Sequence, residues 1–370
     1  MKTQKTNYAS YCLNNIAEGC KFCVKGEKIV LFISGKCKRN CWYCSLSKKR
    51  KNKDKTWCNE RLIKKDKDLI EEVKESNAKG AGITGGDPLI CFNRTLKFAR
   101  MLKNKFGENF HTHIYLPTRN VSLDKLAKLS RYIDEVRFHP EFLINRKIKD
   151  TSKSKDFEGD QKFERTEKIS DVEKIRLAGF FWSKKNIGIE LPLIPDKKKE
   201  ILDFILKSQS YIGFVNLNEF ELSESNFNLV TGKYKLKEGG YVISKSKEAG
   251  LWILRQLEKR KIRLKVHLCT ADLKNQFQFR SRLLRHKILP YGRRTGEGTV
   301  VYLTVKGKNK KELNKLIKKL KGKKFYIDKV KNRIILSVYL AKQLIGKKKI
   351  YRVEEFPTHD RIEIEKEELR

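Results

Sequence analysis

The segment Gly35–Ser45, GKCKRNCWYCS, follows the apolar run 28–34 and holds Cys37, Cys41 and Cys44 in a C-x3-C-x2-C pattern. Three thiolates on one short loop can bind a metal cluster. A cubane 4Fe-4S cluster normally takes four cysteines, so a set of three leaves one iron open for a small ligand. An open position marks reactive metal sites, as it does for zinc. The loop therefore predicts a reactive iron-sulfur site directly after the first strand of the fold.

A second motif, GITGGDP at residues 82–88, follows a helix-like segment and a short apolar run. Glycines allow a ligand to approach the backbone closely. This motif, the cysteine spacing and the aromatic Tyr43 before the last cysteine together resemble the radical S-adenosylmethionine (SAM) enzymes. The resemblance is to an archaeal subgroup related to pyruvate formate-lyase activating enzymes.

This resemblance implies a cofactor set and a role for each motif. In the family, SAM binds the open iron, and one electron from the cluster, supplied by a donor such as ferredoxin or flavodoxin, yields a 5′-deoxyadenosyl radical. The three cysteines of residues 35–45 would hold the cluster. The glycine-rich segment would hold the SAM amino group, with aspartate where many members have glutamate. The SAM-binding residues implied are Tyr43, Gly85, Gly86, Asp87 and Pro88.

A zinc ribbon is the main alternative to an iron-sulfur site. Two C-x2-C pairs are separated by seventeen residues, a spacing typical of such ribbons: Cys20 with Cys23, and Cys41 with Cys44. This alternative leaves Cys12 and Cys37 without a role and does not explain the glycine-rich motif. A zinc-containing RNA-binding protein without enzymatic activity would be the corresponding function.

The N-terminal residues 1–27 carry three more cysteines, Cys12, Cys20 and Cys23. They could hold an auxiliary 4Fe-4S cluster, bind zinc or a single iron, or be free buried thiols. The archaeal radical SAM enzyme that builds the tricyclic wyosine precursor on tRNA is similar in having three N-terminal cysteines, although the spacings differ. We expect a second metal centre here.

Apolar runs alternate with amphipathic helical segments from Lys28 onward, the pattern of a parallel sheet. The helices expected include 61–78, 94–105, 198–208 and 244–259. The fold class predicted is α/β, a partial or near-complete (β/α) radical SAM barrel with ligands at the C-terminal ends of its strands. The strands expected are 28–34, 81–85, 111–116, 135–138, 186–191, 213–220 and 264–269.

Two segments interrupt this alternation. Residues 145–168 are charge-dense without apolar periodicity, which predicts a mobile surface loop. Residues 222–243 form the second break, and the sequence LSESNFNLV within it is expected to lie over the barrel mouth as a lid.

Several polar residues end the predicted strands, where a barrel forms its active-site rim. We expect catalytic roles for Cys269, Glu190 and Glu219. A thiol at the end of the last barrel strand could donate hydrogen, form a covalent intermediate or ligate the auxiliary cluster. Buried free cysteines more often serve as small apolar residues.

The turn-rich sequence ILPYGRRTGEG predicts a domain boundary near residue 295. The elements expected after it follow the order βαββαβ, which is ferredoxin-like. We therefore expect a Cys-rich extension at 1–27, a radical SAM barrel at 28–290 and a small, basic α+β domain at 296–370.

The charge balance predicts the partner. The chain has 370 residues, with 85 Lys and Arg against 44 Asp and Glu, a formal net charge of +41. Such a surplus favours a polyanion, so we expect RNA, most of all tRNA, as substrate. The main alternative is a glycyl-radical activase or another peptide-modifying enzyme. The residues expected to bind phosphates are Arg280, Arg282, Arg285, Arg293 and Arg294.

The sequence also predicts the compartment. No apolar run is long enough to span a membrane, and the N-terminus lacks the apolar core of a signal peptide. Nine cysteines in a long chain of this kind favour metal binding over disulfides. A cytoplasmic protein is expected.

Overall fold

The computed structural model describes residues 2–144, 169–238, 240–307 and 309–370. The surface loop expected at 145–168 lies outside them. The chain divides into two compact units. The first comprises residues 1–22, 30–57 and 80–274, and the second comprises 23–29, 58–79 and 275–370. The predicted domain limits at 27, 290 and 296 stay predictions.

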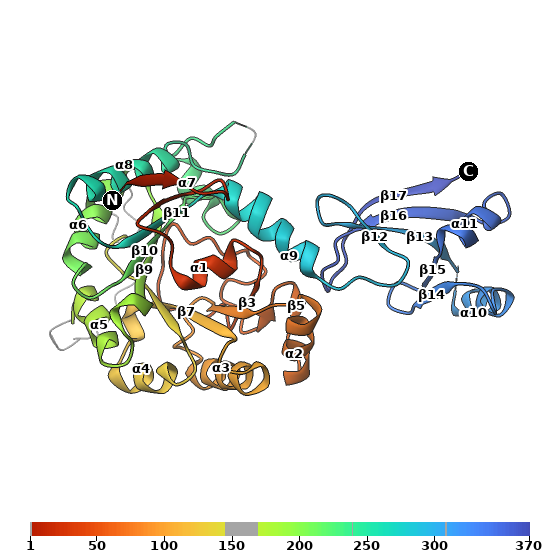
Figure 1. Cartoon of the computed structure of the whole chain (residues 1–370), viewed down its shortest axis with the longest axis horizontal. Helices are drawn as coiled ribbons and strands as arrows, with labels where there is room; N and C mark the ends of the chain where they lie inside the picture. Colours follow the sequence, from red (N-terminus) through yellow and green to blue (C-terminus); the bar gives the residue numbers. More distant parts are fainter. Residues whose placement is uncertain (1, 145–168, 239, 308) are drawn as a thin grey trace, which may run out of the picture. The chain divides into compact units, whose positions relative to one another are not determined.

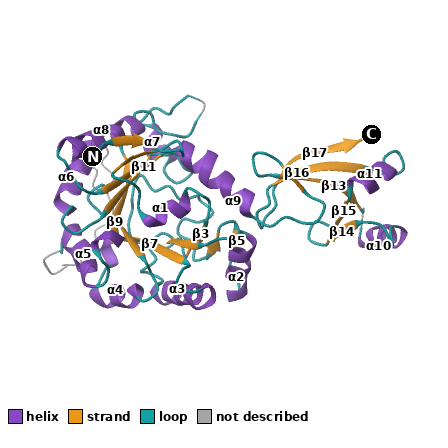
Figure 2. Ribbon diagram, viewed as in Figure 1, coloured by secondary structure: helices purple, strands orange, loops and turns teal. Residues whose placement is uncertain are grey.

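A curved, largely parallel sheet forms the first unit (Figures 1 and 2). All seven predicted barrel strands are present. Neighbouring strands in the sheet follow the order β1-β2-β11-β10-β9-β8-β7-β6-β3. The N-terminal strands β1 (Thr3–Lys5) and β2 (Tyr11–Leu13) run antiparallel to each other, and β2 runs antiparallel to β11. The barrel strands are β3 (Lys28–Phe32), β6 (Gly80–Thr84), β7 (His111–Pro117), β8 (Glu135–His139), β9 (Ile187–Leu193), β10 (Phe214–Glu219) and β11 (Lys265–Cys269).

The strands are buried on both faces, as parallel strands covered by helices usually are. In β3, Ile29 and Leu31 are fully buried. The register then places polar residues of neighbouring strands side by side, for example Asn216 beside Glu190 and His267 beside Asn216. Because successive side chains alternate between the two faces, these polar residues share the face that lines the inside of the barrel.

Helices follow most strands and cover the outside of the curved sheet (Figure 1). The short helix α1 lies instead on the inner side, where Gly19 contacts Glu135 and Arg137. The helices of this unit are α1 (Glu18–Cys23), α3 (Phe92–Phe106), α4 (Leu123–Ser130), α5 (Asp171–Leu177), α6 (Lys198–Ser208), α7 (Phe227–Thr231) and α8 (Ser246–Lys259). In the part of the chain that the structure describes, no helix is both long and apolar enough to cross a membrane.

The helix expected at 61–78 is shorter than predicted. Residues Arg61–Leu62 form strand β5 after β4 (Trp57–Cys58), and helix α2 covers Asp66–Glu75. The Asp68 carboxylate accepts hydrogen bonds from the backbone N–H groups of Lys64 and Lys65, both at 2.8 Å. Because the Asp68 side chain satisfies these two N–H groups, helix α2 begins at Asp66 rather than at Arg61.

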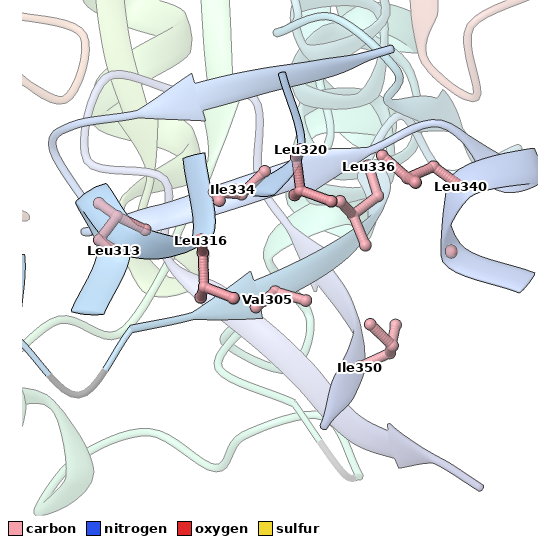
Figure 3. Close-up of a cluster of buried hydrophobic side chains, with 9 residues drawn as sticks. Val305, Leu313, Leu316, Leu320, Ile334, Leu336, Leu340 and Ile350 are labelled. Carbon is pink, nitrogen blue, oxygen red and sulfur yellow. The ribbon is translucent and has the colours of Figure 1, made fainter. Parts of the chain in front are cut away.

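The C-terminal part of the second unit is an antiparallel sheet in the order β14-β15-β13-β16-β17. Strands β13 to β16 and helices α10 and α11 follow the expected βαββαβ order, β12 pairs with β13, and the acidic tail adds β17 at the edge. An apolar core packs between the helices and the sheet, including Val305, Leu316 and Leu336 (Figure 3). The elements are α9 (Arg280–Arg285), β12 (Arg293–Arg294), β13 (Val300–Lys306), α10 (Lys310–Lys319), β14 (Phe325–Asp328), β15 (Arg333–Leu336), α11 (Val338–Leu344), β16 (Ile350–Glu355) and β17 (Glu363–Leu369).

Candidate active site

Backbone hydrogen bonds join the cysteine loop, residues 35–45, to the glycine-rich segment, residues 85–88. Gly86 N–H donates to the Ser34 carbonyl at 2.7 Å, and Asp87 N–H donates to the Lys36 carbonyl at 2.9 Å. A Cβ atom on Gly86 would lie 2.5 Å from the Lys36 oxygen and 2.7 Å from the Gly35 oxygen. Only glycine fits at this position, so the second motif is built against the first.

The three cysteines of this loop, Cys37, Cys41 and Cys44, are each partly buried. Burial raises the pKa of the Cys37 thiol, and Asp87 adds to that rise although the Arg39 N–H opposes it. Burial also raises the pKa of Cys41, against the effect of Arg39. Thiols of this kind lose their protons when they bind a metal.

The spacing of the thiols argues for a cluster rather than a single ion. In the described part of the chain, neither cysteine trio brings three ligand atoms within 4.8 Å of one another. A single zinc ion needs such proximity, because its sulfur ligands all lie about 2.3 Å from the metal. A 4Fe-4S cluster binds each cysteine to a different iron and needs wider spacing. The chemistry of the three thiols of residues 35–45 is compatible with such a cluster.

Asp87 is buried and holds the turn after β6. Its carboxylate accepts hydrogen bonds from Leu89 N–H at 2.9 Å and from the Asn120 amide at 2.6 Å. Burial raises the pKa of this carboxyl, and the two hydrogen bonds oppose that rise. The backbone of Gly85 and Gly86 is thus the better candidate for contact with a cofactor, because both oxygens of the Asp87 carboxylate already accept hydrogen bonds within the protein.

Arg39 and Tyr43 tie the cysteine loop to the neighbouring strands. The Arg39 guanidinium donates to the carbonyls of His139 and Pro140, both at 2.7 Å. The His139 Nδ1–H donates to the Glu190 carbonyl at 2.9 Å, so its Nε2 accepts from the Tyr43 hydroxyl at 3.1 Å. Burial lowers the pKa of His139 to about 4, and Arg39 adds to the effect. Tyr43 therefore serves first to position the loop.

The lining of the barrel is a connected polar network with Glu190 at its centre. The Glu190 carboxylate accepts from the Asn218 amide at 2.6 Å, from the Asn216 amide at 2.9 Å and from Arg137 at 3.3 Å. Arg137 also donates to Glu135 at 2.7 Å, and both are almost fully buried. Arg137 was not singled out by the sequence, because a single arginine in an apolar strand gives no pattern.

Cys269 and Lys274 lie at the end of the last barrel strand. The register places Cys269 beside Asn218, and Lys274 forms an ion pair of 2.6 Å with Glu221. Burial alone would lower the pKa of Lys274, but the negative charges of Cys269, Glu221 and Glu190 outweigh it and raise that pKa. Two predicted catalytic residues, Cys269 and Glu190, are thus close enough to influence one lysine electrostatically. Sequence reasoning missed Lys274, which follows the strand by five residues in VHLCTADLK.

Glu219 faces away from this network. It is next to Asn218 in β10 and so points to the other face of the sheet. Its carboxylate accepts from Ala271 N–H at 2.9 Å and pairs with Lys237. These contacts hold the chain after β11, and a catalytic role for Glu219 stays a prediction that they do not support.

The N-terminal cysteines occupy two different elements. Cys12 lies on β2 beside His267 of β11, and Cys20 lies on α1 inside the barrel. The Cys20 sulfur accepts from Arg137 at 3.4 Å and donates to the side-chain amide oxygen of Asn216 at 3.4 Å. Both thiols are buried, whereas Cys23 is partly exposed. A second metal centre at these cysteines stays a prediction.

The segment after β10 contacts the cysteine loop, whereas a lid over the barrel mouth stays a prediction. The hydroxyls of Ser223 and Ser225 both donate to the Cys44 carbonyl, at 3.1 and 2.7 Å. The Asn226 amide donates to the Tyr43 carbonyl at 3.4 Å. These three residues hold the last turn of the loop in place.

Most of the arginines expected to bind phosphate form contacts within the second unit. Arg282 pairs with Glu60 at 2.6 Å and Arg285 pairs with Glu27 at 3.5 Å. Arg280 donates to the Gly296 carbonyl at 2.7 Å, and Arg294 donates to the Leu283 carbonyl at 2.8 Å. Arg293 is exposed on β12. The stretch is therefore largely a structural element rather than an open basic surface.

Comparison with known proteins identifies the family. Residues 31–169 match the radical SAM superfamily, and residues 298–369 match a domain of unknown function, DUF8061. A protein of Methanocaldococcus jannaschii, provisionally named as a glycyl-radical enzyme activating enzyme, is 32% identical over 97% of this chain and 94% of its own length.

Two solved structures are distantly similar. The methyltransferase TsrM of Kitasatospora setae, a radical SAM enzyme, is 10% identical with a TM-score of 0.36 over 72% of this chain and 52% of its own. Coproporphyrinogen III oxidase (HemN) of Escherichia coli is 12% identical with a TM-score of 0.35 over 70% of this chain and 59% of its own. The Methanocaldococcus jannaschii protein, which aligns with nearly the whole chain, and the match of residues 31–169 to the family establish the assignment. This chain belongs to the radical SAM superfamily, and its cofactors are a 4Fe-4S cluster and SAM.

Proposed function

We propose that this enzyme removes a hydrogen atom from a polypeptide, as the activator of a glycyl-radical enzyme does. The observation that carries the proposal is the 32% identity, over 97% of the chain, to a protein provisionally named as such an activating enzyme. The internal contacts of Arg282, Arg285 and Arg294 support it as well, because they weaken the case for RNA.

Cys37, Cys41 and Cys44 would hold the cluster, and the backbone of Gly85 and Gly86 would face SAM. When bound, the cluster and SAM supply a 5′-deoxyadenosyl radical that abstracts hydrogen from carbon. The Ser223 and Ser225 hydroxyls and the Arg39 guanidinium keep the cysteine loop in one position. A one-electron donor such as ferredoxin or flavodoxin would reduce the cluster.

The polar network would orient the substrate at the mouth of the barrel. Glu190 offers a carboxylate, and Lys274 offers an ammonium group that stays charged. A peptide main chain presents N–H donors and C=O acceptors that match these two groups. We propose that Glu190 and Lys274 position the target glycine, with Cys269 at the end of the neighbouring strand.

A second candidate is the modification of RNA, tRNA above all. One observation favours it, the net charge of +41. A surface with this surplus attracts phosphates without requiring the arginine stretch.

Deuterium transfer tests the proposal directly. The reduced holoenzyme is incubated without oxygen with SAM and a glycine-containing peptide deuterated at the glycine α-carbon, and in parallel with deuterated tRNA. Mass spectrometry of the 5′-deoxyadenosine formed shows which substrate loses hydrogen. We expect deuterium from the peptide and none from tRNA, and a loss of about tenfold or more in transfer for Lys274→Ala. Deuterium from tRNA alone would instead establish the second candidate.

A further inference from the structure

The second unit contains a group of metal-ligating side chains far in sequence from the cysteines. Among the described residues, Glu72, Glu75 and His286 are the one group of three His, Cys, Asp or Glu whose ligand atoms all lie within 4.8 Å. The two glutamates are three residues apart on α2 and so share one face of that helix. The Lys287 N–H donates to the Glu75 carbonyl at 2.6 Å, which fixes the neighbouring imidazole against the end of α2.

The imidazole of His286 points an unused nitrogen at this group. Its Nδ1 lies 3.1 Å from the Lys287 carbonyl, to which a neutral ring donates its one N–H. Its Nε2 then carries a lone pair, and this atom is buried without a hydrogen-bond partner. It lies 3.8 Å from Glu72 Oε1, too far for a hydrogen bond. Glu72 Oε1 also accepts a hydrogen bond from the Asn59 amide at 2.9 Å, so the unused lone pair of this pair of atoms is that of Nε2, and a cation between Nε2 and Oε1 would bind both.

The separation suits a single metal ion. Zinc binds histidine nitrogen and carboxylate oxygen at about 2.0–2.2 Å, so two ligands of one ion lie at most about 4.3 Å apart. A ring Nδ1–H that donates to a backbone carbonyl is the usual partner arrangement for a metal-binding histidine. Glu72 and His286 are buried, whereas 39% of the Glu75 side chain is exposed, which leaves a path for an ion to enter.

The charges around the group favour a cation. Arg61 is the guanidinium in contact with the glutamates, and it pairs with Glu71, Glu72 and Glu75 together. Three carboxylates against one guanidinium leave negative charge in a chain whose net charge is +41. Arg61 bonds Oε2 of Glu72, and Oε1 of Glu72 faces the imidazole.

The imidazole of His359 is influenced by the charges of the same residues. Burial and Arg61 lower the pKa of His359, whereas Glu72 and Glu75 raise it. His359 itself is exposed.

We propose that Glu72, Glu75 and His286 bind a divalent transition-metal ion, for which Zn²⁺ is the best-fitting probe. One imidazole and two carboxylates form a donor set that zinc accepts, and three protein ligands leave a fourth position for water. The ion would tie the end of α2 to the chain that follows α9. This inference does not depend on the proposed function.

Equilibrium dialysis of the anaerobic holoenzyme tests the site. The protein is first treated with a chelator that leaves the iron-sulfur cluster intact, then dialysed against zinc sulfate, and zinc and iron are measured by mass spectrometry. X-ray absorption at the zinc edge identifies the ligands. The variants are Glu72→Gln and His286→Gln. The matched control is Glu71→Gln, which removes an equal charge and another Arg61 contact from α2 but leaves the three ligands in place.

We expect one tightly bound zinc per chain, with nitrogen and oxygen ligands only. Both variants should bind it at least about tenfold more weakly, and Glu71→Gln should bind it like the parent. Circular dichroism shows whether each variant is folded, and Glu75→Gln replaces any that is not. Zinc with sulfur ligands, or equal binding by all variants and the control, would place the ion at the cysteines and overturn the proposal, as would no zinc at all.

Discussion

Close backbone contact at Gly86 decides whether the cysteine loop can take its position. The residue sits where two carbonyl oxygens of that loop leave no room for a side chain. Sequence alone predicted a glycine-rich motif there, but the reason in the structure is the packing of one motif against the other. The glycine therefore acts on the cluster-binding loop, not only on a ligand.

We predict that Gly86→Ala loses most of its iron. The new methyl group would lie 2.5 Å from the Lys36 oxygen, and backbone cannot move aside as a flexible side chain can. Iron content and the absorbance near 400 nm measure the effect. Gly179→Ala is the matched control, because a Cβ there meets nothing within 4 Å. Equal iron in the two variants would contradict this account of the motif.

His139 predicts a dependence of barrel stability on pH. Burial and Arg39 lower its pKa to about 4, whereas an unfolded chain binds the proton near about 6.5. Between these two pKa values the unfolded state therefore binds more protons than the folded state. The stabilisation contributed by a neutral His139 is fully present above about pH 6.5. It decreases as the pH is lowered, by at most about 1.4 kcal/mol per pH unit. Burial lowers the pKa of His267 to about 3, which adds a slope in the same direction.

We predict that His139→Asn has a shallower dependence. Its amide can still donate to the Glu190 carbonyl, but it does not take up a proton. Urea unfolding of the parent and the variant between about pH 5 and pH 6.5 gives the two slopes, and His267 keeps the variant slope above zero. Parallel slopes would show that His139 is not held neutral.

At the scale of elements, the segment after β10 holds the cysteine loop closed. The two serine hydroxyls share one acceptor, the Cys44 carbonyl, and Cys44 is the last of the three cysteines that we propose hold the cluster. The segment is short and partly exposed, so we expect its hydrogen bonds to the cysteine loop to be the interactions of the site that are most easily broken.

We predict that Ser223→Ala with Ser225→Ala loses its cluster several times faster in air. Two hydrogen bonds of about 1 kcal/mol each are removed, and the loop opens more often. The decay of absorbance near 400 nm measures the rate. Thr231→Ala is the control, because its hydroxyl bonds only the Phe227 carbonyl within the same segment. A rate of cluster loss equal to that of the control would show that these hydrogen bonds do not protect the cluster.

The sequence predicted elements better than it predicted side-chain partners. All seven barrel strands could be predicted, because apolar runs and helical periodicity are local signals. The roles of Arg137 and Lys274 could not, since they depend on strand register and on Glu190. The helix expected at 61–78 begins later, at Asp66, for a similar reason: Arg61 belongs to strand β5 and pairs with three glutamates.

At the scale of the whole molecule, composition alone does not identify the substrate. The net charge of +41 suggested RNA, yet several arginines of the most suggestive stretch hold the second unit together. Charge counts do not distinguish a cation that is paired inside a fold from one that is open to a partner. Relatedness along nearly the whole chain carries more weight.

The central claim is that Cys37, Cys41 and Cys44 hold the cluster at which SAM is cleaved. The most direct measurement is the formation of 5′-deoxyadenosine by the reduced, anaerobically reconstituted protein and by the variant with all three changed to Ala. Changing Cys12, Cys20 and Cys23 to Ala gives a matched control with the same number of thiols removed. We predict that the first variant forms no 5′-deoxyadenosine and that the control still forms it. Retention of 5′-deoxyadenosine formation by the first variant would contradict the account.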